Sequence, residues 1–71
     1  MAVVKVIELL AESPNSWEDA TKEALREAQK TVRGIKNIWV KEQQAVVANG
    51  QITGYRVDVM ISFEVQEQGR P

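Results

Sequence analysis

The 71-residue sequence contains no cysteine and no histidine. Without cysteine the chain forms no disulfide and offers no thiolate to a metal ion. Without histidine it lacks the most common general base and the most common metal-ligating side chain. The four glycines are scattered, so no glycine-rich loop that binds phosphate is present. These absences leave little material for acid–base or nucleophilic chemistry, and the sequence predicts a protein that is not an enzyme.

Net charge and hydrophobic length are limited as well. The formal net charge is -1, which does not indicate a nucleic-acid partner. No apolar run is long enough to cross a membrane, and no signal peptide with a basic start is visible. We therefore expect a cytoplasmic protein with neither a nucleic-acid nor a membrane partner. A chain of this length forms one domain with a small core, and self-association is the usual way to stabilise such a core without disulfides.

The segment from Ser13 to Gly34 has the features of one amphipathic helix. Ser16 is a suitable N-cap, and acidic residues follow it in the first turn, where the helix dipole favours them. Lys30 and Arg33 fall in the predicted last turn, and Gly34 is placed to adopt the left-handed conformation that ends a helix. The apolar face consists mostly of small side chains: Ala20, Ala24, Leu25, Ala28 and Val32. A face of this kind allows a sheet to pack closely against the helix.

Three segments have the composition and alternation of strands. Met1 to Leu10 predicts a first strand, and Ile35 to Val47 and Gln51 to Val65 predict two longer ones. Asn49-Gly50 lies between the longer strands and is a strong signal for a tight hairpin, because both residues tolerate positive φ. From Tyr55 onward the last strand alternates apolar and polar residues, so its apolar side faces the helix.

The predicted fold class is therefore α+β, with element order β-α-β-β and a three-stranded antiparallel sheet wrapped around one helix. Residues 1–71 form this single domain, of which 66–71 are a polar tail. By alternation, the sheet face away from the helix carries Asn37, Trp39, Lys41, Gln43, Ala45, Arg56, Asp58 and Met60. A tryptophan and a methionine on that face need cover, and we expect a second copy of the chain to provide it.

Several short stretches stand in a fixed order and spacing along the chain: KVIELLAESPNSWEDA, KTVRG, VKE and YRVDVMISFEV. In these stretches and in its order of elements, the chain resembles the dodecins, small β-α-β-β proteins whose sheet wraps a single helix. The resemblance covers nearly the whole chain. It implies a hollow homododecamer without catalytic activity. It also implies riboflavin or FMN bound in pairs near two-fold axes, as in many members, for storage, buffering or photoprotection.

The resemblance further implies the residues of a flavin site. The tryptophan that stacks on the flavin ring in other members falls on Asn37, and the glutamine that hydrogen-bonds the ring edge falls on Arg56. Trp39, two residues further along, supplies an aromatic surface on the same face. We therefore predict a flavin or similar planar ligand at Asn37, Trp39 and Arg56. The alternative is a flavin-less shell with a structural or calcium-type cation-binding role, in which Trp39 and Arg56 serve subunit contacts.

Charged residues suggest two other ligands. The candidate oxygen ligands for a hard divalent cation are Glu8, Glu12, Asp58 and Glu64. They lack the spacing of a calcium-binding loop, so no metal site is assigned within one chain, and a site would have to form between subunits. The candidate contacts for phosphate are Lys5, Lys41 and Arg33, for which solvated surface charge is the alternative interpretation.

Overall fold

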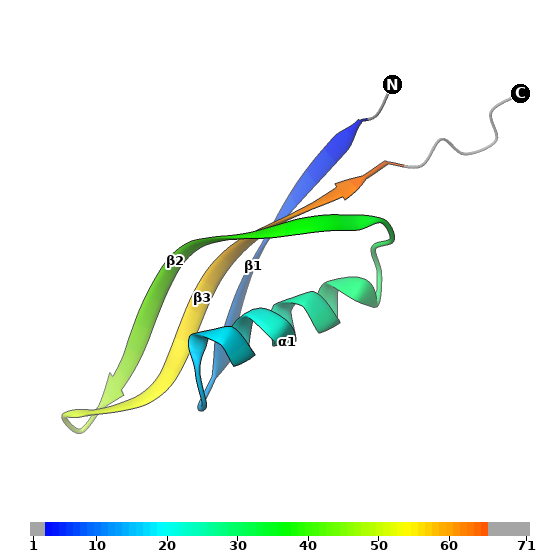
Figure 1. The fold of residues 1–71 in the computed structure, drawn as a ribbon. Helices are drawn as coiled ribbons and strands as arrows, with labels where there is room; N and C mark the ends of the chain where they lie inside the picture. The colour runs from blue at the N-terminus through cyan, green and yellow to red at the C-terminus, as the bar shows by residue number, and fades with distance from the viewer. Residues whose placement is uncertain (1–2, 66–71) are drawn as a thin grey trace, which may run out of the picture.

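The structure, a computed structural model, describes residues 3–65 as a curved antiparallel sheet with one helix lying along its concave side (Figure 1). The elements are β1 (Val4–Ser13), α1 (Trp17–Gln29), β2 (Ile35–Ala48) and β3 (Gln51–Glu64). The strand order is β1-β3-β2, so β3 is central and pairs antiparallel with both neighbours. The predicted α+β class and β-α-β-β order are confirmed, whereas the predicted tail over 66–71 lies outside the described residues. Among those residues, α1 is neither long nor apolar enough to cross a membrane.

The start of α1 is fixed by a small network of polar side chains. The Ser16 hydroxyl accepts a hydrogen bond from the backbone N–H of Asp19 at 2.9 Å, which confirms Ser16 as the N-cap. Ser13 is buried, with 2% of the residue exposed, and its hydroxyl donates a hydrogen bond to Oδ2 of Asp19 at 2.7 Å. It also accepts from the Asn15 N–H at 2.9 Å. β1 therefore continues to Ser13, beyond the predicted end at Leu10, because Ser13 pairs in the sheet and also anchors the helix.

The end of α1 differs from the prediction. The helix stops at Gln29, with Lys30 as the C-cap, so Arg33 lies in the connection to β2 rather than in the last turn. The N–H groups of residues 31 and 32 both bond the carbonyl of Ala28, which closes the helix with a tight turn. Gly34 does have a left-handed backbone, with φ of 76°, but it lies beyond this turn at the entry to β2. Its conformational freedom serves the connection to the sheet and not the helix end.

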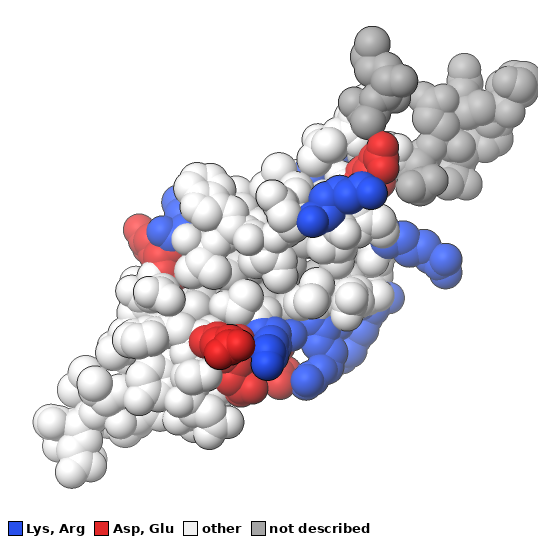
Figure 2. All heavy atoms as spheres, in the orientation of Figure 1, with Lys and Arg blue, Asp and Glu red and all other residues white. Residues whose placement is uncertain are grey.

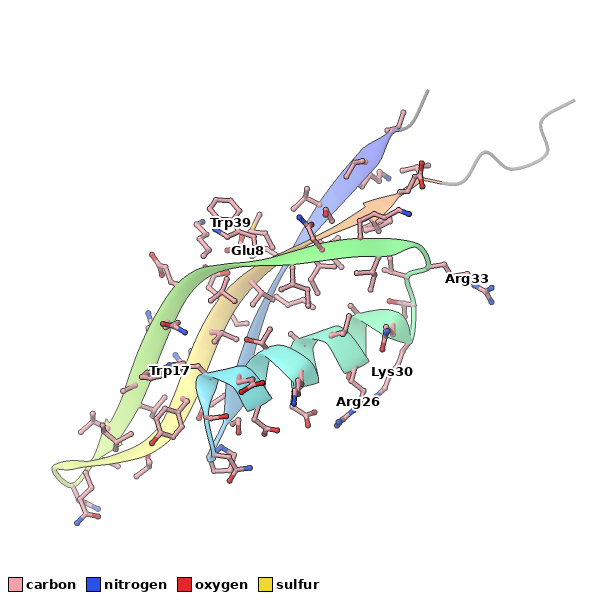
Figure 3. All side chains as sticks on the ribbon, in the orientation of Figure 1. Glu8, Trp17, Arg26, Lys30, Arg33 and Trp39 are labelled. Carbon is pink, nitrogen blue, oxygen red and sulfur yellow. The ribbon has the colours of Figure 1, made fainter. Side chains whose placement is uncertain are left out.

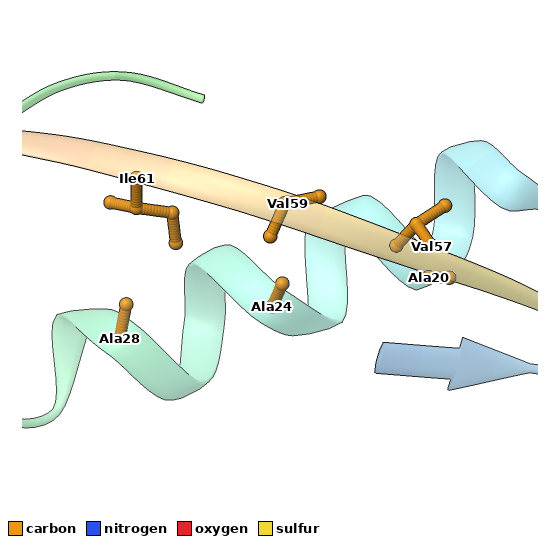
Figure 4. Close-up of a cluster of buried hydrophobic side chains, with 6 residues drawn as sticks. All are labelled: Ala20, Ala24, Ala28, Val57, Val59 and Ile61. Carbon is orange, nitrogen blue, oxygen red and sulfur yellow. The ribbon is translucent and has the colours of Figure 1, made fainter. Parts of the chain in front are cut away.

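The core lies between α1 and the centre of β3 (Figure 4). Its members, none more than 4% exposed, are Ala20, Ala24, Ala28, Val57, Val59 and Ile61. The three alanines repeat at four-residue spacing on one side of α1, and the three larger residues alternate along β3. The predicted helix-facing side of β3 is therefore confirmed. Because alanines have little volume, the helix backbone approaches the sheet closely, and no room is left for larger side chains.

β2 contains an irregularity that changes which of its residues face the helix. The register with β3 shifts between Val40 and Glu42, where β2 has one more residue than its partner. Since side chains alternate, the extra residue reverses the facing of the residues that follow, up to the next register shift after Val46. Gln43 and Ala45 pair with helix-facing residues of β3, so their predicted position on the opposite face was wrong. Glu42 and Gln44 occupy that opposite face instead.

The hairpin between β2 and β3 extends beyond the start of the helix (Figure 1). Asn49 and Gly50 have φ of 54° and 75°, which confirms the predicted tight turn. At the base of the hairpin, the rings of Trp17 and Tyr55 meet edge to face, with centroids 5.0 Å apart. The Trp17 indole N–H donates to the Gln44 carbonyl at 2.8 Å. The first residue of α1 thereby holds both strands of the hairpin.

Candidate binding site on the outer face of the sheet

We call the sheet surface turned away from α1 the outer face. The strand register places on it Val4, Val6, Glu8, Leu10, Glu12, Asn37, Trp39, Glu42, Gln44, Arg56, Asp58, Met60, Ser62 and Glu64. Figure 3 shows Glu8 and Trp39 on the side of the sheet opposite the helix. Several large apolar side chains are exposed here: Leu10 by 70%, Trp39 by 61%, Val4 by 54% and Val6 by 52%. Exposed apolar area of this extent is typical of a contact surface.

Of the predicted flavin-site residues, Asn37 and Trp39 lie together. Trp39 is opposite Met60 in the β2–β3 ladder, and Asn37 is opposite Ser62. The Ser62 hydroxyl donates a hydrogen bond to the Asn37 side-chain oxygen. Trp39 therefore lies across the ladder from Met60 and one outer-face row away from the Asn37–Ser62 pair.

Arg56, the third predicted residue, is on the same face but not in the same place. It lies four residues from Met60 along β3, which separates it from the Trp39 row by about 13 Å. Its guanidinium Nε and a terminal nitrogen donate to one carboxylate oxygen of Glu12 at 3.2 and 3.0 Å. The structure therefore brings Asn37 and Trp39 together and holds Arg56 at a separate ion pair.

Two of the predicted cation ligands, Glu8 and Asp58, form a pair of carboxylates. They occupy diagonal positions on β1 and β3. The adjacent Asp58 carboxylate raises the pKa of Glu8, and the Lys41 ammonium group acts in the opposite direction. Lys41 Nζ lies 3.8 Å from Oε2 of Glu8. Within residues 3–65, the buried Oδ1 of Asp58 has no hydrogen-bond partner, so the pair has unused capacity to accept a proton or a cation.

The other two predicted ligands are neutralised within the chain. Glu12 binds Arg56, and Glu64 lies 3.6 Å from Lys36 Nζ. No group of three metal-ligating side chains gathers anywhere in the described part of the chain. A calcium ion takes six to eight oxygen ligands. Glu8 and Asp58 are therefore at most part of a cation site, and the remaining ligands must come from water or from another copy.

The sequence alone did not show that Glu8 and Asp58 are neighbours. Both were recognised as candidates, but their adjacency depends on the β1–β3 register. Charged side chains otherwise gather along α1 and at a few positions of the sheet, and Figure 2 shows uncharged surface over much of the strands and hairpin. Against this background, the carboxylate pair is the chemically distinctive feature of the outer face.

Comparison with known proteins identifies the class to which this fold and outer face belong. A family model described as Dodecin matches residues 3–66. A mutant of the Thermus thermophilus dodecin, solved as a crystal structure, matches with a TM-score of 0.89 and 30% identity. The match covers 94% of this chain and 100% of that one. The chain therefore belongs to the dodecin family, which confirms the resemblance noted in the sequence.

Two further matches are to a protein of Mycobacterium tuberculosis. The chain is 42% identical over 67 residues to the calcium dodecin of strain ATCC 25618 / H37Rv, with 93% of both proteins covered. The crystal structure of a calcium dodecin from that species matches with a TM-score of 0.80 and 35% identity, over 97% of each chain. That protein is described as a calcium-chelating immunodominant antigen with a novel calcium-binding site.

Proposed function

We propose that this protein assembles into a homo-oligomeric shell, a homododecamer, through contacts that include the outer face. Support comes from the exposed Leu10 and Trp39 and from the shape of the chain. Its radius of gyration is 15.1 Å, whereas a compact chain of this length has about 11 Å. Size-exclusion chromatography with light scattering tests the proposal. A monodisperse species at the chain mass of 8.0 kDa contradicts it.

We propose further that the shell binds a divalent cation of the calcium type, with Glu8 and Asp58 among its ligands, and that it has no catalytic role. The observation that carries this proposal is the carboxylate pair, in which one Asp58 oxygen has no hydrogen-bond partner among residues 3–65. A bound cation neutralises the repulsion between the two carboxylates and gives the oxygen a partner. Similarity to a calcium dodecin supports the choice of ion. We also propose that the protein is cytoplasmic, as expected from the sequence.

Calorimetric titration of the chelator-treated oligomer with calcium chloride tests cation binding. We expect Glu8→Gln and Asp58→Asn each to weaken binding at least about tenfold, because each removes a charged oxygen ligand. Glu18→Gln is the matched control, since Glu18 is an exposed carboxylate on α1 with one weak ion pair to Lys22 at 3.8 Å. No heat of binding in the unsubstituted oligomer, or equal weakening in the control, contradicts the proposal.

Flavin storage is the second candidate function, favoured by the exposed Trp39 ring beside Asn37. An indole on the outer face of one copy, facing another copy, offers a surface on which riboflavin or FMN can stack. Arg56 can contribute to such a site only if its guanidinium group leaves Glu12, or if the Arg56 of a neighbouring copy reaches the site.

Quenching of riboflavin fluorescence tests this second candidate. Trp39→Ala should abolish quenching, while Trp17→Phe, which changes the tryptophan at the base of the hairpin, should retain it. A purified protein with yellow colour supports flavin binding. Dissociation of the Trp39→Ala variant without any effect of flavin identifies Trp39 as a subunit contact and contradicts the flavin site.

A further inference from the structure

A pocket of about 380 Å³ lies at the end of the molecule away from the hairpin, where the connection from α1 to β2 passes β1 and β3. Most of its lining lies on the helix-facing side of the sheet, where Lys5 and Phe63 pair, and Glu64 of the outer face contributes at its edge. A neighbouring hollow shares Val32 and Arg33 with it and continues toward Gln29 at the end of α1. The combined surface has the size of a small-molecule site.

The rim of this pocket is positively charged. Lys5 and Arg33 both line it, and neither forms an ion pair within residues 3–65. Figure 3 shows the Arg33 side chain extending outward from the connection between α1 and β2 into open space. Glu64 also lines the pocket, but Lys36 lies 3.6 Å from its carboxylate and offsets its charge. The partial negative charge at the end of α1 is about half an elementary charge, less than the two cations supply.

The floor of the pocket is apolar. Val32, Phe63 and Val65, which we call the floor, line the pocket and are half-buried, so each residue keeps part of its surface accessible. The Thr31 hydroxyl is the neutral polar group among the lining residues. A cationic rim over an apolar floor matches a ligand that has an apolar body and one anionic group.

We propose that this pocket binds a soluble organic anion, in which a phosphate, sulfonate or carboxylate group is attached to an apolar ring. The anionic group contacts Lys5 and Arg33, and the ring lies on Val32, Phe63 and Val65. The sequence had already indicated Lys5, Arg33 and Lys41 as candidate phosphate contacts. The structure brings the first two into one pocket and places Lys41 beside Glu8 on the outer face.

A fluorescence titration of the assembled, full-length protein with anilinonaphthalene sulfonate tests this assignment. We expect Lys5→Gln and Arg33→Gln each to raise Kd about tenfold, because each removes a charge-assisted contact to the sulfonate. Lys22→Gln is the matched control. It removes the same charge from an exposed lysine on α1 and should leave Kd unchanged. Equal Kd values in all four proteins overturn the proposal, since the probe then binds elsewhere.

Competition separates the two parts of the site. Naphthyl phosphate should displace the probe, whereas inorganic phosphate at the same concentration should not, because it has no apolar body to occupy the floor. Displacement by inorganic phosphate with equal strength overturns the role given to the apolar residues. Neither experiment involves calcium or the Glu8 and Asp58 carboxylates, so their failure leaves the proposed cation binding unaffected.

Discussion

At the scale of single residues, two carboxyl groups have pKa values moved in opposite directions by their neighbours. The hydrogen bond donated by Ser13 lowers the pKa of Asp19 at the start of α1. The nearby Asp58 raises the pKa of Glu8 on the outer face. The first group is therefore held in its charged form by the fold, and the second is held back from ionising. Each shift predicts how stability changes with pH.

Asp19 should make the fold sensitive to acid. Because its pKa is lower in the folded chain, its contribution to stability is present above the unfolded value of 3.8 and is lost as the pH falls through the folded pKa. We expect Asp19→Asn to lower the free energy of unfolding near neutral pH and to reduce the difference between neutral and acidic pH. Urea unfolding at both pH values measures this. An unchanged difference between the two pH values contradicts the assignment.

Glu8 should act with the opposite sign. Its folded pKa lies above the ordinary value of 4.5, so the folded state holds this proton more tightly. The stability it contributes is present at low pH and is lost as the pH rises from that value through the folded pKa. We expect Glu8→Gln to remove this loss, and thermal unfolding at a series of pH values measures it. Saturating calcium should have a similar effect on the unsubstituted protein if the pair binds the ion.

At the scale of elements, the close contact between α1 and β3 determines which substitutions the chain tolerates. Ala24 is 3% exposed and lies against the apolar side of β3. We expect Ala24→Leu to destabilise the fold by about 1–3 kcal/mol, because the added atoms have no space without displacing the helix. Chemical denaturation measures the change. Lys22→Leu, on the exposed side of α1, is the control and should change stability by no more than about 0.5 kcal/mol.

The same elements show what the sequence predicts and what it does not. The N-cap at Ser16 and the turn at Asn49-Gly50 depend on contacts within a few residues, and both were predicted correctly. The end of α1 was placed too late, because Gly34 serves the connection and not the helix. The register shift after Val40 has no local signature, so the facing of Gln43 and its neighbours required the structure.

In the candidate site, too, local features could be predicted from the sequence and contacts between strands could not. Alternation was sufficient to place Trp39 and Arg56 on one face, because it needs only the strand itself. Which of these side chains are neighbours depends on pairing between strands that are distant in sequence. That pairing places Glu12 next to Arg56 and Asp58 next to Glu8. Contacts to another copy depend, in addition, on how whole chains pack together, which local sequence patterns do not determine.

At the scale of the whole molecule, one sheet face is covered by α1 and the other carries exposed apolar side chains. Leu10, at 70% exposure, is the most exposed of these among the described residues. We expect Leu10→Lys to dissociate the proposed oligomer while changing the stability of the isolated chain little, because an exposed side chain contributes little to its own fold. Light scattering over a range of protein concentrations measures dissociation. Gln29→Lys, an exposed position on α1, is the control that should leave assembly intact.

β3 has a hydrogen-bonded neighbour on each edge and a different environment above and below it. If copies associate through the outer face, as proposed, consecutive residues from Arg56 to Ile61 alternate between contacts inside one copy and contacts between copies. A substitution at an odd number, such as Val59, should reduce the amount of folded protein. A substitution at an even number, such as Met60, should leave folded protein that fails to associate. Variation along this one strand would then reveal, position by position, which losses arise inside a copy and which arise between copies.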